Sequence, residues 1–175
     1  MTNKQELTPA IIDLEASGFG RRSYPIEIGI ALASGQTHCF LIKPHALWTY
    51  WDNNAERVHG ISREILDSRG HEITDIATSL NELLYGQTIY SDGWGMDMSW
   101  LGKLYELAGI AQQFRLAQLQ ALFQPQQYER WHDTYKQLQN DLKLKRHRAS
   151  ADALLIQQTF IHTREQFDTK IKVAR

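Results

Sequence analysis

Residues 10–20 read AIIDLEASGFG, an apolar run that ends in two acids and passes at once into a glycine-containing turn. A β-strand sends residues i and i+2 to the same face, roughly 6.5–7 Å apart along the chain. Asp13 and Glu15 are therefore expected on one face of a strand, with Leu14 on the other. Two carboxylates at that spacing repel each other unless a cation lies between them, and a metal ion would be such a cation.

The segments that follow predict a mixed sheet with helices on its faces. Two more strands joined by a Ser34-Gly35 hairpin are expected first, and strands then alternate with helices. Three antiparallel strands followed by β/α units are typical of an α/β protein. Strands are expected at residues 10–16, 25–33, 37–44, 87–91 and 114–119, and helices at residues 74–84, 98–110, 124–142 and 150–167.

Particular residues mark the expected ends of these helices. Thr74 or Asp75 would cap the first helix, and Ser150 would cap the last. Gly109 would end the second helix, and Pro125 would stand at the start of the third.

The composition predicts one globular domain over residues 1–175. Hydrophobic residues make up 42% of the chain and charged residues 22%, and the sequence has no repeat or Pro/Gly-rich linker. No apolar run approaches the ~20 residues that span a bilayer, and residues 1–10 lack the apolar stretch of a signal peptide. The single cysteine, Cys39, favours a reducing compartment. We therefore expect a cytoplasmic protein that does not associate with membranes.

The charges separate an acidic first part from a basic last part. A net charge of −1 argues against a protein that coats long nucleic acid through charge alone. Residues 1–100 hold 7 Lys and Arg against 13 Asp and Glu, whereas residues 101–175 hold 12 against 7. The basic stretch KLKRHR (143–148) either steers phosphate groups toward an acidic site or is a solvated surface.

Two further acids are expected to join Asp13 and Glu15. Asp97 follows the fourth strand in SDGWGMDMSWL (91–101), and Asp152 lies in the first turn of the last helix in HRASADA (147–153). If the first and fourth strands are neighbours, all four carboxylates gather at one edge of the sheet. Such a set favours a hard divalent ion, Mg²⁺ or Mn²⁺, whereas the sequence contains no Cys and His cluster of zinc spacing.

His147 adds a candidate general base, since it lies five residues before Asp152 and just outside the last helix. An unperturbed imidazole, with a pKa of ~6.5, suits proton transfer near neutrality. Two metal ions roughly 3.5–4 Å apart would stabilise the attacking and leaving oxygens of a phosphoryl displacement. The combination indicates phosphodiester hydrolysis. The alternative is that His147 is one more polar residue of a basic loop.

Three segments resemble the motifs of the DEDDh 3′–5′ exonuclease superfamily, which includes the proofreading subunit of bacterial DNA polymerase III and ribonuclease T. DLEASG (13–18) resembles the first motif, WGMDMSWL (94–101) the second and HRASAD (147–152) the third. VHGISREIL (58–66) resembles the histidine-glycine-isoleucine segment between the first two. The resemblance implies a ribonuclease H-like fold, with a mixed central sheet flanked by helices. It also implies two-metal release of nucleoside monophosphates from the 3′ end of single-stranded DNA or RNA.

The same resemblance implies the roles of the candidate residues. Asp13, Glu15, Asp97 and Asp152 would hold the metal ions, and His147 would be the general base. The partner would be a single-stranded 3′ end, and the resemblance leaves a homodimer or a place in a larger complex open.

Residues after the first motif would contact the terminal nucleotide by the same resemblance. These are Ser17, Gly18 and Phe19, with Phe19 stacking on a base, a contact worth about 1–3 kcal/mol. Burial of Phe19 in the core is the alternative. His59 is a further candidate for substrate contact, although a turn-closing role before Gly60 explains it as well.

The second motif departs from the family pattern. The family commonly has Asn-Ala-any-Phe-Asp where this chain has GWGMD (93–97), so Asp92 competes with Asp97 for the ligand role. Trp100 and Leu101, which follow, favour Asp97. Ala16 stands where threonine is frequent. The alternative functions are a catalytically silent nucleic-acid-binding or regulatory module and a phosphodiesterase restricted to short oligonucleotides.

Overall fold

In the residues that the computed structural model describes, 8–143 and 147–173 with side chains up to residue 164, five strands form one mixed sheet. The strand order is β3-β2-β1-β4-β5. β1, β2 and β3 pair antiparallel, whereas β1 with β4 and β4 with β5 pair parallel. The strands are β1 Ile11–Ala16, β2 Pro25–Ala31, β3 Thr37–Leu41, β4 Thr88–Ser91 and β5 Arg115–Gln118.

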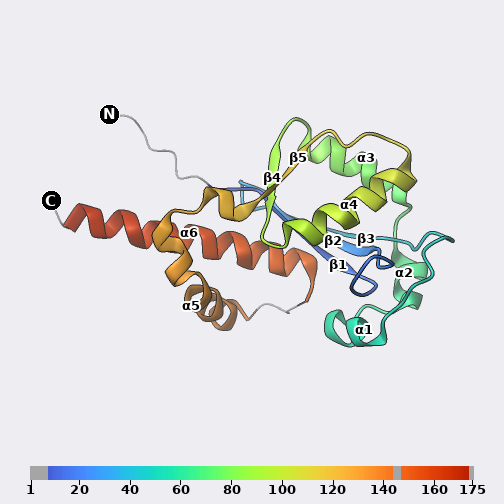
Figure 1. Ribbon diagram of the computed structural model, residues 1–175, viewed down its shortest axis with the longest axis horizontal. Coiled ribbons are helices and arrows are strands. Elements are labelled where there is room, and N and C mark those ends of the chain that lie inside the picture. The colour runs from blue at the N-terminus through green and yellow to red at the C-terminus, as the bar shows by residue number, and fades with distance from the viewer. Residues whose placement is uncertain (1–7, 144–146, 174–175) are drawn as a thin grey trace.

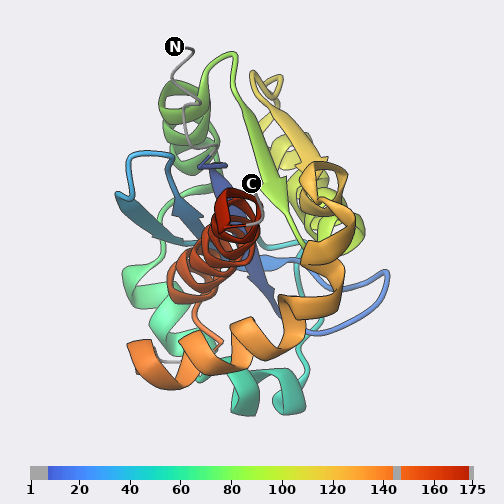
Figure 2. The same cartoon turned by 90° about the vertical axis from the view of Figure 1, so that its left-hand side faces the viewer.

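Helices cover both faces of this sheet (Figure 1). α5 and α6 lie on one face, and α3 and α4 lie on the other; α6 crosses the middle of the sheet in the view of Figure 2. No helix in the described part of the chain is long and apolar enough to cross a membrane. The helices are α1 Asn53–His59, α2 Arg63–Arg69, α3 Ile73–Leu84, α4 Trp94–Ala108, α5 Pro125–Leu142 and α6 Ala149–Val173, with a short 3-10 helix η1 Leu119–Leu122.

The two faces of β1 belong to different parts of the core. Ile12 and Leu14 pack into the cluster that contains the buried residues of α3 and α4, whereas Ile11 packs against α6. Because side chains alternate along a strand, Asp13 and Glu15 lie on the α6 face with Ile11. The predicted common face of the two acids is confirmed.

α6 approaches β2 closely at Gly29, which pairs with Asp13 in the sheet register. A Cβ at this position would lie 2.0 Å from the carbonyl carbon of Ala149 and 2.0 Å from the backbone nitrogen of Ser150. Glycine is the residue that allows such an approach of one backbone to another. The start of α6 is therefore seated over the part of the sheet that carries Asp13.

The α/β class, the mixed sheet and the neighbourhood of the first and fourth strands are confirmed. Gly109 ends α4 in the left-handed conformation, and Pro125 begins α5, as predicted. α4 begins at Trp94 rather than at residue 98, so Asp97 lies in its first turn and not in the preceding loop. α1 and α2 were not predicted.

Two predicted helix caps are wrong. The N-cap of α3 is Glu72, not Thr74 or Asp75, because the helix already includes Ile73, which is buried in the core. Ser150 does not cap α6, which begins one residue earlier at Ala149. The backbone N–H of Ala149 instead donates to the carboxylate of Glu27, on another element, at 2.8 Å.

Candidate active site

A cavity of about 370 Å³ is lined by residues from the end of β1, from α1 and from the first turns of α6. Its volume falls at the lower end of the range of small-molecule sites, roughly 300–1,000 Å³. The acidic and histidine side chains that line it are Asp13, Glu15, Asp52, Asp92, Asp152, His59 and His147. Apolar and aromatic side chains complete the wall, among them Phe19, Val58, Tyr135 and Ile156.

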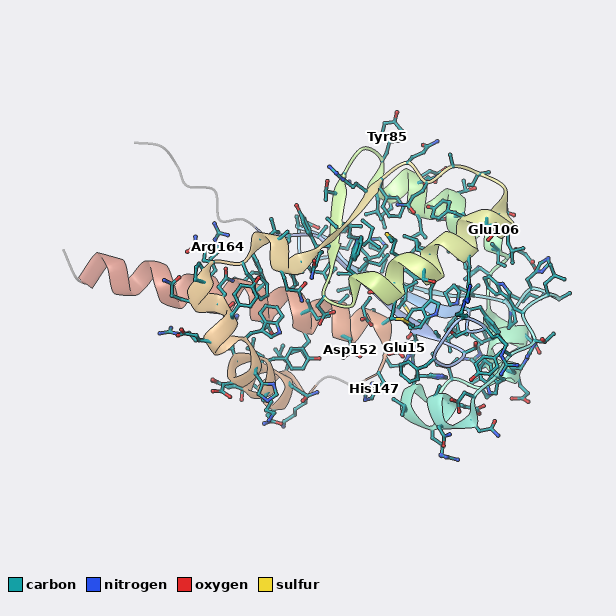
Figure 3. The ribbon with its side chains drawn as sticks, viewed as in Figure 1. Glu15, Tyr85, Glu106, His147, Asp152 and Arg164 are labelled. Atoms are coloured by element: carbon teal, nitrogen blue, oxygen red, sulfur yellow. The ribbon has the colours of Figure 1, made fainter. Side chains whose placement is uncertain are left out.

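Glu15, His147 and Asp152 converge at one point of this cavity. One potential ligand atom from each residue lies within 4.8 Å of the other two, and Figure 3 shows the three side chains together at the start of α6. Glu15 comes from β1, Asp152 from the first turn of α6 and His147 from the residues just before that helix. The structure therefore brings together three of the predicted site residues from opposite ends of the chain.

Burial and mutual repulsion raise the pKa values of both acids on β1. Burial is the largest cause for each: it holds the pKa of Asp13 well above its usual range and contributes most to raising that of Glu15 to about 8. The charge of Asp152 adds to the shift at both residues. A divalent cation would offset this repulsion, and carboxylate oxygens are the ligands that hard divalent ions prefer. The residues present fit such an ion.

Asp97 and Asp92 both lie close enough to Asp13 to raise its pKa by their charge. Asp97 is buried, and its carboxylate accepts hydrogen bonds from the Ser91 hydroxyl and the backbone N–H of Leu14. Burial nevertheless raises the pKa of Asp97 to about 7. Asp92 lines the cavity directly, and burial raises its pKa as well. The choice of Asp97 over Asp92 as a metal ligand stays a prediction.

His59 ends α1 and is one of the residues that line the cavity. Its Nδ1 accepts a hydrogen bond from the backbone N–H of Ile61 at 3.1 Å, so Nε2 carries the hydrogen in the neutral ring. Nε2 has no hydrogen-bond partner among the described residues. Burial also lowers the pKa of His59, which favours the neutral ring. His59 therefore closes the turn before Gly60, and its Nε2 is buried although other atoms of the residue line the cavity.

Phe19 lies at the tip of the turn after β1 and is 76% exposed, so the alternative of burial in the core is wrong. Gly18 and Phe19 both line the cavity. A Cβ on Gly18 would lie 2.8 Å from a ring carbon of Tyr50, which explains the glycine. Ser17 is fully buried, and its hydroxyl accepts a hydrogen bond from the backbone N–H of Tyr24 at 3.2 Å. The side chain of Ser17 shapes the turn, and its substrate contact stays a prediction.

The basic stretch 143–148 is only partly described, because residues 144–146 lie outside the described residues. Lys143 is exposed after α5. Arg148 points inward and binds the carboxylate of Glu27 at 2.6 Å. The charge of Arg148 is therefore already neutralised by a side chain of the sheet.

Asp52, Tyr135 and Ile156 are among the cavity-lining residues that belong to none of the sequence motifs. Asp52 caps α1, since its side chain accepts from the backbone N–H of Asn54 at 2.8 Å. An aspartate before two asparagines is a helix-start signal that could have located it. Tyr135 reaches the cavity because α5 packs along α6, and no local signal indicates that contact.

No protein-family model matches the sequence, and no curated protein matches it. Several solved structures of exonuclease I do. Exonuclease I from Methylocaldum szegediense matches with a TM-score of 0.68 at 13% identity, over 89% of this chain and 40% of that one. E. coli exonuclease I in complex with a dT13 oligonucleotide matches with a TM-score of 0.65 at 12% identity, over 91% and 42%. The zinc-bound form of the E. coli exonuclease I–single-stranded DNA complex matches at 0.62 and 13%, over 95% and 41%.

These similarities establish the fold. The chain has the ribonuclease H-like architecture found in exonuclease I, and the expected resemblance is confirmed at that level. It spans about 40% of the length of the exonuclease I chain from Methylocaldum szegediense.

Proposed function

We propose that this chain is a metal-dependent 3′–5′ exonuclease that hydrolyses phosphodiester bonds at the 3′ end of single-stranded DNA or RNA and releases nucleoside monophosphates. The observation that carries the proposal is the convergence of Glu15, His147 and Asp152 within 4.8 Å, in a cavity that Asp13 also lines. Solved exonuclease I structures of the same fold hold dA16 or dT13 oligonucleotides or single-stranded DNA, which supports this class of substrate.

Asp13, Glu15, Asp97 and Asp152 are the residues that would hold the Mg²⁺ or Mn²⁺ ions, two by analogy with the DEDDh superfamily. When bound, the ions would stabilise the charge that develops on the attacking and leaving oxygens of an in-line displacement. Without a cation, the pKa values of about 8 for Glu15 and about 7 for Asp97 leave these two groups partly protonated near neutrality.

His147 would act as the general base. Its neutral ring would take a proton from the attacking water at the unprotonated nitrogen. The backbone supports this placement, because the N–H of His147 donates to Oδ2 of Asp152 at 2.8 Å. That hydrogen bond fixes the backbone of His147 relative to Asp152, one of the two carboxylates that converge with its side chain.

The opposite wall of the cavity would receive the terminal nucleotide. The exposed ring of Phe19 is available for stacking on a base, a contact that tolerates any sequence. The ring of His59 lines the same cavity, and we expect it to contact that nucleotide.

The test is a cleavage time course on 5′-labelled single-stranded DNA and RNA of matched sequence, with Mg²⁺ or Mn²⁺. We expect a ladder that shrinks one nucleotide at a time. Asp152→Asn and His147→Ala should abolish it. Asp133→Asn, which changes an exposed acid of α5 in the same way, should not.

The other outcomes separate the alternatives. Cleavage of short oligonucleotides alone, with Mn²⁺ binding intact, would assign a phosphodiesterase of short substrates. The absence of both cleavage and Mn²⁺ binding would contradict the enzymatic proposal and leave a silent module.

A further inference from the structure

Glu27 on β2 is a fully buried acid that holds the start of α6. Its Oε1 accepts hydrogen bonds from Arg148, at 2.6 Å from Nη2 and 2.9 Å from Nε. Its Oε2 accepts from the backbone N–H of Ala149 at 2.8 Å. The Cys39 thiol donates to Oε1 at 3.2 Å. One carboxylate therefore binds two consecutive residues at the N-terminus of the helix.

Stability alone is a weak explanation for this arrangement. Taking the Glu27 carboxylate out of water is costly, although its partner Arg148 stays 33% exposed, and apolar replacements of buried ion pairs are often as stable. The two-nitrogen contact of Arg148 instead fixes direction as well as distance. The bond to Ala149 satisfies one of the N–H groups that a helix start leaves without an intrahelical partner.

The two residues that Glu27 binds, Arg148 and Ala149, directly follow His147 in the chain. The backbone of His147 is left-handed, with a φ of 56°, which is uncommon for a residue other than glycine. Its N–H donates to Asp152 at 2.8 Å. The direction of the His147 side chain therefore depends on its backbone conformation, directly before the two residues that Glu27 binds.

In the sheet, Glu27 is also a neighbour of Glu15, the third member of the cluster formed with His147 and Asp152. Glu27 pairs directly with Glu15 across the β1–β2 ladder. Glu27 thus stands in the sheet beside one member of the cluster, while it binds the segment that carries the other two. It does not line the cavity among the described residues.

We propose that Glu27 is a positioning residue. Through the Arg148 guanidinium and the Ala149 N–H, it holds His147 and Asp152 at the distance from Glu15 that a divalent ion requires. The expected effect of Glu27 on cleavage rests on the proposed function, whereas its expected effect on metal binding does not.

The experiment compares Glu27→Gln and Arg148→Lys with the parent chain. Glu27→Gln keeps the shape of the side chain and removes its charge, whereas Arg148→Lys keeps a cation and loses the two-nitrogen contact. Glu72→Gln is the matched control, because it breaks an exposed 2.8 Å ion pair with Lys43. The readouts are folding by circular dichroism, Mn²⁺ affinity by titration calorimetry, and kcat and KM on a single-stranded oligonucleotide at saturating Mn²⁺.

We expect both variants to remain folded and to lose about 10- to 100-fold in Mn²⁺ affinity, as is usual when a group that orients metal ligands is removed. kcat should fall while KM for the oligonucleotide stays unchanged, because Phe19 and His59 are not held by Glu27. Glu72→Gln should match the parent in every readout.

A folded Glu27→Gln variant with the Mn²⁺ affinity and kcat of the parent would overturn the proposal. If Glu27→Gln does not fold, Arg148→Lys decides in its place, and parental Mn²⁺ affinity there would overturn it. A parent that binds Mn²⁺ but does not cleave, with variants that lose affinity, would retain the positioning role and contradict the exonuclease. A parent that cleaves, with variants that bind Mn²⁺ as tightly as the parent, would support the exonuclease and contradict the positioning role.

Discussion

A carboxylate oxygen of Glu15 on β1 lies within 4.8 Å of one from Asp152 on α6. After burial, Asp152 is the largest cause that raises the pKa of Glu15 to about 8. Two acids this close destabilise each other unless a proton or a cation is shared between them. The fold nevertheless holds both in place, which is the arrangement expected of a site for a divalent cation.

The raised pKa of Glu15 predicts how stability depends on pH in the metal-free protein. Because the folded-state pKa of about 8 exceeds the ordinary value of 4.5, the folded state binds this proton more tightly than the unfolded state. The resulting stabilisation is fully present below pH 4.5 and is lost as the pH rises through about 8. Melting temperatures between pH 4.5 and 8 should therefore fall more steeply for the parent than for Glu15→Gln. Parallel curves would contradict the prediction.

Mn²⁺ should reverse this trend at high pH. The ion binds only the folded cluster and therefore raises the melting temperature by mass action. The increase should be larger at pH 8 than at pH 6, because fewer protons then compete for Glu15. The Mn²⁺-dependent increase in melting temperature should be absent in Asp152→Asn. It should persist in Asp133→Asn, which changes an exposed acid of α5.

Asp97→Asn should lower kcat by about 100-fold, because removal of a single group that stabilises charge in a transition state typically has an effect of this size. Asp92→Asn is the matched comparison, since it neutralises a neighbouring acid that lines the cavity. The ligand assignment requires the larger loss of kcat and of Mn²⁺ affinity in Asp97→Asn. If Asp97→Asn lowers the melting temperature but leaves kcat and Mn²⁺ affinity unchanged, the role of Asp97 is structural. It then acts as the hydrogen-bond acceptor for the Ser91 hydroxyl and the Leu14 N–H.

Phe19→Ala should weaken substrate binding without a cost in stability, because the side chain is 76% exposed. Loss of one stacking contact, about 1–3 kcal/mol, corresponds to an increase in KM of about 5- to 150-fold. Tyr85→Ala is the control: this aromatic side chain is 72% exposed and lies far from the cluster in Figure 3. Equal KM values for the two variants would argue against stacking.

Gly29→Ala should destabilise the fold by about 1–3 kcal/mol, the usual cost of overpacking. The new Cβ would meet the Ala149 backbone at 2.0 Å and displace the start of α6, so Mn²⁺ affinity should fall too. Gly102→Ala on α4 is the matched control, because no atom lies within 4 Å of its added Cβ. It should stabilise the protein by about 0.5–1 kcal/mol in urea unfolding. A stable Gly29→Ala variant with normal Mn²⁺ binding would contradict the close-approach argument.

The sequence by itself determined those features that depend on near neighbours in the chain. The two-residue period of a strand was enough to place Asp13 and Glu15 on one face, and Gly109 and Pro125 marked helix ends through their own backbone preferences. Motif order indicated that Asp152 and His147 belong with these acids, and the structure brings Glu15, His147 and Asp152 together.

Only the tertiary structure decided how the cluster is held. Ser150 had the local signature of a cap, yet the acceptor for the Ala149 N–H is Glu27, far away in the sequence on β2. Tyr135 reaches the cavity because α5 packs along α6. Such contacts depend on which surfaces pack together when the sheet and helices assemble. A local sequence pattern does not specify those surfaces. The sequence therefore indicated which groups could perform the chemistry, and the packing of α6 on β1 and β2 determined their distances and orientation.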